Sequence, residues 1–116
     1  MMKMSVEERN GVTVLKPEIE ELDFKNTVWL RGELYDLLKN DQVKVLLDLI
    51  NVSMISGYTV GVFLAFARNF RDEGGDLRFL NLQERVKCSF EAARINYILE
   101  IFGDEEKAVQ SFSEGK

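Results

Sequence analysis

The stretch from Val43 to Val62, VKVLLDLINVSMISGYTVGV, constrains the fold of this chain more than any other segment. Residues 43–49 are almost all apolar and rich in leucine and β-branched side chains, which is typical of a strand covered on both faces. A polar loop at 53–59 follows, and the residues after it show helical spacing. In α/β domains, the loop that joins a buried strand to a helix commonly carries the functional residues. We therefore expect the function to lie in residues 53–59.

The flanking sequence predicts an alternation of strands and helices. Asn10-Gly11 suits a two-residue hairpin turn between extended segments 4–9 and 12–16. The later strands should be parallel, because strands joined through helices require crossover connections. The expected order is β-β-α-β-α-β-α-β-α, an α/β fold with a mixed sheet of about five strands and about four helices in a single domain, residues 1–116. After the hairpin, we expect helices over 23–39, 58–73, 83–93 and from 104, and strands over 43–49, 77–80 and 98–102.

Charge and composition exclude several classes of function. The net charge is −5, and no Lys/Arg cluster is longer than a pair, which argues against nucleic-acid binding. The chain has no histidine and one cysteine, so the commonest general base and the commonest metal sites are absent. We expect no enzyme activity, no metal and no cofactor. Cys88 is predicted to be a half-buried helix residue in a reducing compartment.

The hydropathy pattern bears on location. Apolar runs are interrupted by charges well before 18 residues, and the first residues have no apolar core like that of a signal peptide. The sequence therefore predicts a cytoplasmic protein without a membrane span.

The acidic residues before and within the first strand–helix unit could be imagined as a metal site. A helix cap at Asp23, a polar strand position at Asp48 and a solvated loop at Glu18, Glu20 and Glu21 explain them better.

The second helix has a predicted core stripe and a predicted surface strip. The core stripe comprises Val60, Phe63, Leu64, Ala67 and Phe70. The opposite side carries Tyr58, Val62, Ala65 and Asn69, which is either a docking face beside the loop or plain surface. Trp29, off the apolar stripe of the first helix, is expected to contact a neighbouring element.

The order of elements and several quoted segments resemble the STAS domain of bacterial anti-sigma factor antagonists. The likeness extends over nearly the whole chain, and it depends on several pieces in the right order and spacing. These pieces are VLLDLINVSMIS from Val45, Gly61-Val62-Phe63-Leu64, EGGDLRFLNL over 73–82, and IFGDEEKA over 101–108. The resemblance implies a regulator that binds a kinase-type anti-sigma factor and releases a sigma factor.

The signature loop differs from that of the family. In the family it reads Asp-Ser-Ser-Gly, and the first serine is phosphorylated by the anti-sigma factor. These positions fall here on Ser56, Gly57, Tyr58 and Thr59, so a glycine occupies the acceptor position. The resemblance therefore implies the fold and the partner class, while phosphorylation at the usual position is not expected. Ser56 and Thr59 remain as hydroxyls that could accept phosphate, although helix capping explains both.

The loop and the start of the helix are the predicted docking surface for the partner. The predicted contacts are Ser53, Met54, Ser56, Gly57, Tyr58, Thr59 and Val62. A helix N-terminus favours anions, so the free domain would tolerate a phosphate added there. The negative charge of that phosphate would disturb a docked acidic or apolar partner. Two alternatives stay open: a STAS-type ligand sensor or subunit of a larger complex such as a transporter, and, least favoured, an enzyme that uses carboxylates or hydroxyls. Whether the chain forms a homodimer is also open.

Overall fold

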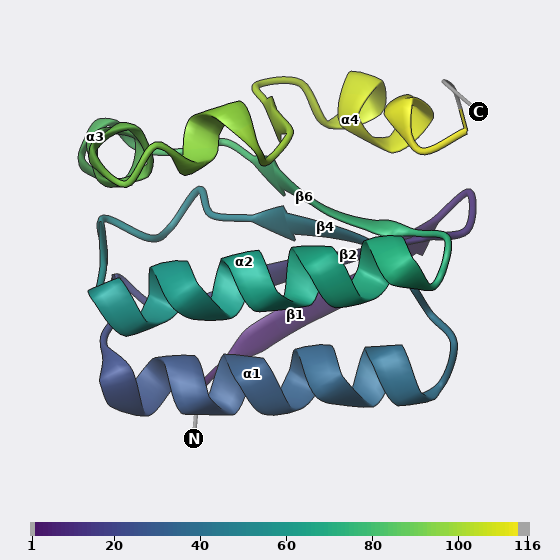
Figure 1. Ribbon diagram of the computed structural model, residues 1–116, viewed down its shortest axis with the longest axis horizontal. Coiled ribbons are helices and arrows are strands. Elements are labelled where there is room, and N and C mark those ends of the chain that lie inside the picture. Colours follow the sequence, from purple (N-terminus) through teal and green to yellow (C-terminus); the bar gives the residue numbers. More distant parts are fainter. Residues whose placement is uncertain (1, 114–116) are drawn as a thin grey trace.

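The computed structural model describes residues 2–113 and confirms the predicted α/β fold (Figure 1). Its main sheet has five strands in the order β1-β2-β4-β6-β7, and a second, two-stranded sheet pairs β3 with β5. The elements are β1 (Met4–Arg9), β2 (Val12–Pro17), β3 (Glu21–Leu22), α1 (Phe24–Lys39), β4 (Lys44–Asp48), β5 (Met54–Ile55), α2 (Gly57–Asp72), β6 (Asp76–Leu80), α3 (Glu84–Ala92), the 3-10 helix η1 (Ile95–Tyr97), β7 (Ile101–Phe102) and α4 (Glu105–Ser111).

The opening hairpin forms where the sequence predicts it. β1 pairs antiparallel with β2, and the turn residues Asn10 and Gly11 have φ angles of 52° and 82°. These values match the left-handed positions that an Asn-Gly turn supplies. From β2 onward the neighbours β2–β4, β4–β6 and β6–β7 are all parallel.

Side chains alternate along the central strands between two apolar clusters. Val45 and Leu47 of β4 belong to the larger cluster, which also contains the buried residues of α1, α2 and α3. Leu46 points to the other face and packs with Ala108 and Val109 of α4. Figure 1 shows α1 and α2 side by side, with α4 far from them. Helices on both faces explain why β4 is apolar throughout.

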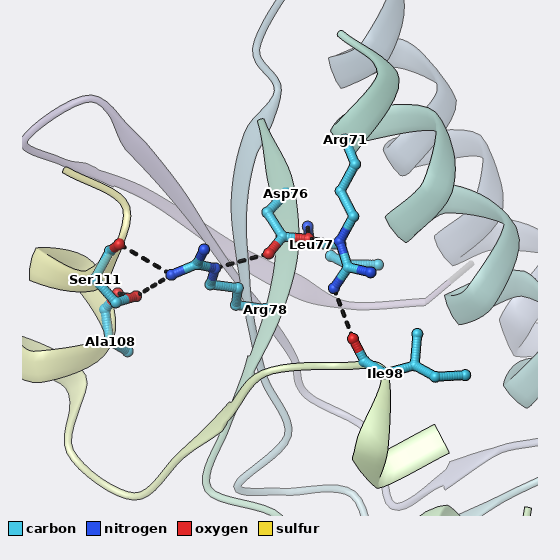
Figure 2. A network of polar contacts seen from close by, with 7 residues as sticks. All are labelled: Arg71, Asp76, Leu77, Arg78, Ile98, Ala108 and Ser111. Atoms are coloured by element: carbon cyan, nitrogen blue, oxygen red, sulfur yellow. Dashed lines mark hydrogen bonds and ion pairs between the residues drawn. The ribbon is translucent and has the colours of Figure 1, made fainter. Parts of the chain in front are cut away.

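A polar network fixes the end of the sheet away from the predicted loop (Figure 2). Asp76, buried at the start of β6, accepts hydrogen bonds from Arg71 Nε at 2.6 Å and Arg78 Nε at 2.8 Å. Arg71 also donates to the carbonyl of Ile98 at 2.8 Å, and Arg78 Nη1 donates to Ser111 Oγ at 2.7 Å. One carboxylate thus connects α2, β6, the segment after η1 and α4.

Three local expectations differ from the structure. The small sheet of β3 and β5 was not predicted, because strands of two residues carry no periodic signal. The strand expected over 98–102 is confined to Ile101–Phe102, because the N–H groups of Ile98 and Leu99 both donate to the carbonyl of Ile95 and so close the turn of η1. Cys88 lies on α3 as expected, but it is exposed rather than half-buried. Its helix contacts the core through Val86 and Phe90, which lie on another side.

Candidate docking loop at the start of α2

Hydrogen bonds at two points, the end of β4 and the strand β5, hold the loop between β4 and α2 in place. Where β4 ends, Asp48 Oδ1 accepts from the backbone N–H of Ile50 at 3.1 Å and from Asn81 Nδ2 at 3.3 Å. Further along, β5 pairs in parallel with β3, and the N–H of Ser53 donates to the carbonyl of Glu20 at 2.7 Å. The backbone of the loop is therefore fixed by hydrogen bonds before α2 begins.

Ser56 and Thr59 form a capping box at the start of α2. Ser56 Oγ accepts from the N–H of Thr59 at 3.2 Å, and Thr59 Oγ1 accepts from the N–H of Ser56 at 3.2 Å. This pattern satisfies two N–H groups that would otherwise lack a partner at the helix terminus. The capping explanation of both hydroxyls is confirmed.

The Thr59 hydroxyl also links the loop to α1 and β3. Its Oγ1 donates to the carbonyl of Leu22 at 2.8 Å and lies 2.7 Å from Thr27 Oγ1. Thr59 is fully buried, and Ser56 is half-buried with its Oγ 2.8 Å from Thr59 Oγ1. A kinase has no access to the Thr59 hydroxyl in this fold, and only Ser56 is partly accessible.

Gly57, which the sequence resemblance predicts to stand at the phosphoacceptor position, begins α2 and is exposed. A Cβ built there would have no atom within 4 Å, and the φ angle of this glycine is not in the left-handed region. Neither space nor backbone geometry therefore requires glycine at this position. The chain lacks the acceptor hydroxyl, while the site could accommodate a serine.

Tyr58 connects the loop to the N-terminal end of α1. Its half-buried ring packs against Phe24 with the centroids 4.6 Å apart and the ring planes tilted by 44°, and its hydroxyl accepts from Arg31 Nη1 at 2.9 Å. Phe24 itself is 64% exposed. An aromatic pair on the surface beside the loop gives this region apolar contact area that remains open to a partner.

The prediction that Val62 belongs to the exposed strip on α2 is wrong. This residue is 6% exposed and belongs to the core cluster, whereas Ala65 and Asn69 are exposed as expected. Val62 is covered because α1 lies beside α2, so the flank of α2 that faces α1 is buried. On the predicted core stripe, Val60 and Leu64 are only half-buried.

The structure brings the other predicted docking residues together at the loop. Ser53 and Met54 are half-buried at the start of β5, beside Ser56, and Gly57 is exposed one residue further on. The docking role of all seven predicted residues stays a prediction.

A stripe on α1 was missed by the sequence interpretation. Phe24, Val28, Arg31 and Tyr35 share one side of this helix, and the three apolar members are 64%, 43% and 54% exposed. Their signal is a second helical periodicity beside the core stripe, at intervals of three and four residues. Trp29, on the other side of α1, lines a hollow together with Met4 and Val6 of β1, and its contact with a neighbouring element stays a prediction.

Two of the acidic candidates have structural roles, while Glu18, Glu20 and Glu21 are exposed, with Glu21 in β3 and not in the expected loop. Asp23 caps α1, since its carboxylate accepts from the N–H of Asn26 at 2.9 Å. Asp48 holds the turn after β4, as described above. Within residues 2–113, no three acidic or cysteine side chains converge in a way suited to a metal ion.

Comparison with known proteins places the chain in a family. A family model described as "STAS domain" matches residues 3–108. No curated protein matches in sequence. Within the part of the chain that the structure describes, neither 16-residue helix, α1 or α2, nor any other helix is long and apolar enough to cross a membrane.

Several solved structures share the fold. The Thermotoga maritima protein TM1081 is 20% identical, with a TM-score of 0.89 and coverage of 96% of this chain and 95% of that one. The Bacillus protein SpoIIAA, solved in its phosphorylated form, is 16% identical, with a TM-score of 0.72 and coverage of 94% and 98%. SpoIIAA is an anti-sigma factor antagonist. At these identities the likeness shows the fold.

The same fold also occurs inside a transporter. Murine Slc26a9, an anion transporter, is 15% identical, with a TM-score of 0.74; the match covers 92% of this chain but only 18% of the transporter. The likeness to this much longer protein is thus confined to one of its parts.

Proposed function

The chain belongs to the STAS domain family, and on this premise we propose that it is an anti-sigma factor antagonist that catalyses nothing itself. In this proposal it binds a kinase-type anti-sigma factor in the cytoplasm and so releases a sigma factor. The family match and the likeness to the antagonist SpoIIAA support this function. The observation that carries the docking surface is the fixed loop at 53–59 with the exposed Phe24–Tyr58 pair beside it.

The solvent exposure of the predicted docking residues indicates which of them would contact the partner. Met54, Gly57 and Tyr58 offer accessible surface at the start of α2, and Ser53 and Ser56 add hydroxyls at its edge. Thr59 and Val62 are buried, so they act by holding α2 against α1 and not by direct contact. The docking surface is therefore the loop with Phe24, and residues 59 and 62 support it from below.

The proposed antagonist acts without phosphorylation at the family's usual position. Gly57 has no hydroxyl, and the neighbouring hydroxyls of Ser56 and Thr59 are engaged in the capping box. A phosphate on Ser56 would break the cap that starts α2. Activity would then be set by the amount of protein or by another input, because the kinase cannot switch the antagonist off.

The experiment compares three proteins incubated with the anti-sigma kinase and ATP. The wild-type protein should keep its intact mass and should still release sigma factor. The double variant Ser56→Asp/Gly57→Ser restores the first two residues of the family's loop, and residue 57 has room for the serine side chain. This variant should gain one phosphate and lose its activity. Gly61→Ser places a serine on an exposed glycine one turn further along α2 and serves as the matched control. It should gain no phosphate.

Two results would contradict the proposal. If the wild-type protein binds no kinase-type anti-sigma factor of its organism, the proposed function has no partner. Phosphate found on Ser56 of the wild-type protein would show that the acceptor position has shifted by one residue.

The second candidate function is a STAS subunit of a larger assembly, such as a transporter, and the likeness to part of Slc26a9 favours it. In that case the chain would co-purify with a membrane protein from native membranes, and it would not release sigma factor. Thermal-shift measurements with anions would test the related ligand-sensor alternative, since ligand that binds only the folded state raises its melting temperature.

A further inference from the structure

A shallow apolar groove runs along the outer side of the α1–α2 layer. Next to the loop it includes a hollow of about 320 Å³ lined by Arg31, Tyr58, Gly61, Val62, Ala65 and Phe66. Phe24, Val28 and Tyr35 continue this surface along α1. From residue 24 to residue 35 this apolar surface is about 16 Å long, since an α-helix rises about 1.5 Å per residue. This length matches three turns of a second helix.

The α2 side of the groove is built from small residues. Gly61 and Ala65 lie one turn apart, and both are exposed. A Cβ at Gly61 would have no neighbouring atom within 4 Å, so the space above this residue is open. Because neither residue has a long side chain, another helix can approach the backbone of α2 closely. On the α1 side Arg31 lines the hollow, and the exposed Phe24, Val28 and Tyr35 of the same helix extend the apolar surface.

Charge complements this shape. Among residues 2–113, no carboxylate lies within ion-pair distance of Arg31, whose side chain donates only to the Tyr58 hydroxyl. Arg31 is the one charged residue among those that line the hollow, so this surface carries a positive charge in a chain whose net charge is −5. A partner segment with negative charge is favoured at this surface.

We propose that the groove binds an amphipathic helix of a partner protein. Its apolar side chains would lie over Gly61 and Ala65 and against the exposed aromatic residues of α1, and an Asp or Glu side chain would pair with Arg31. Helices that dock in this manner place apolar anchors at intervals of three, four and seven residues. The inference rests on the proposed function in one respect, because it extends the docking surface at the loop. Its test needs no anti-sigma factor.

The test is a selection from a display library of helical peptides of about 14 residues, the usual length of a helix in globular proteins. The wild-type protein is the bait, and the variant Gly61→Leu is used for counter-selection. Peptides that survive should carry apolar residues at helical spacing together with a carboxylate. Their affinity should fall at least tenfold for Gly61→Leu, which fills the groove, and for Arg31→Glu, which reverses its charge.

Matched controls separate groove binding from damage to the fold. Gly32→Leu makes the same substitution as Gly61→Leu at an exposed glycine of α1 that has free space around it and does not line the hollow, and Lys25→Glu makes the same charge reversal as Arg31→Glu on another side of α1. Both variants should bind the selected peptides like the wild type, and all four should have unchanged circular dichroism. No enrichment, basic peptides, or equal binding to Gly61→Leu would overturn the proposal. Dimers of the wild type that Gly61→Leu abolishes would also overturn it, because the occupant would then be a second copy.

The outcome is separate from that of the proposed function. If the anti-sigma factor binds equally to wild type and Gly61→Leu and no peptide is selected, the antagonist function stands and the groove proposal fails. If peptides bind in the groove but no anti-sigma factor binds at all, the groove stands and the antagonist function fails.

Discussion

The substitution Thr59→Val tests how the loop is held. Valine has nearly the shape of threonine, so the change removes the hydroxyl while leaving the packing intact. The hydroxyl donates to the carbonyl of Leu22 at 2.8 Å, accepts from the N–H of Ser56 at 3.2 Å and pairs with Thr27 Oγ1 at 2.7 Å. Thr59 is fully buried, so water cannot replace these bonds without rearrangement of the loop.

The expected loss follows from these contacts. A buried polar group left without a partner costs about 1–3 kcal/mol, and each ordinary hydrogen bond contributes about 1 kcal/mol. With the Leu22 carbonyl left unpaired and the capping box broken, we expect Thr59→Val to lower the free energy of unfolding by about 2–4 kcal/mol. For a domain of this size each kcal/mol corresponds to roughly 4 °C in melting temperature. The melting temperature should thus fall by about 8–16 °C.

The assay is urea denaturation followed by circular dichroism, with a double-mutant cycle. Thr27→Val removes the other hydroxyl, and the two changes should be less than additive by about 1 kcal/mol because they share one hydrogen bond. Thr13→Val is the matched control, since Thr13 is also buried but its hydroxyl makes no hydrogen bond to residues 2–113. A loss below about 1 kcal/mol for Thr59→Val, or one equal to that of Thr13→Val, would refute the reasoning.

Two further predictions concern stability. Asp76→Asn removes the charge that holds two arginines and should lower the free energy of unfolding by about 2–3 kcal/mol, less than for a fully buried pair because the side chain of Arg71 is 36% exposed; an unchanged urea midpoint would contradict this. Gly75→Ala would place a Cβ in a steric clash with the carbonyl oxygen of Val43 and should cost about 3 kcal/mol. Gly61→Ala, where nothing is near, should stabilise α2 by up to about 1 kcal/mol, and similar thermal shifts for the two glycine variants would count against the packing argument.

The elements with strong local signals were predicted from the sequence. Asn10-Gly11 supplied the two positive φ angles of the hairpin turn, and Ser56 and Asp104 each begin a helix with a side-chain cap. The apolar run of β4 also predicted helices on both faces of the sheet. In these places the backbone conformation follows from the residues themselves and their immediate neighbours.

Features that depend on distant contacts could not be predicted. β5 is a strand only because β3 lies beside it, and neither has enough residues to show a pattern. Val62 was expected at the surface because a helical wheel places it away from Phe63, but the wheel does not contain α1. The Phe24–Tyr58 pair joins residues that are far apart in the sequence, so the apolar surface beside the loop became visible only in three dimensions.

The most direct test of the proposed function is a titration of a preformed complex of sigma factor and kinase-type anti-sigma factor with this protein, in the presence of ATP. Sigma release and the intact mass of the protein are followed together. We predict that sigma factor is released, that release persists on long incubation, and that the mass does not change. No release at saturating protein, or release that decays as the protein gains a phosphate, would contradict the proposal.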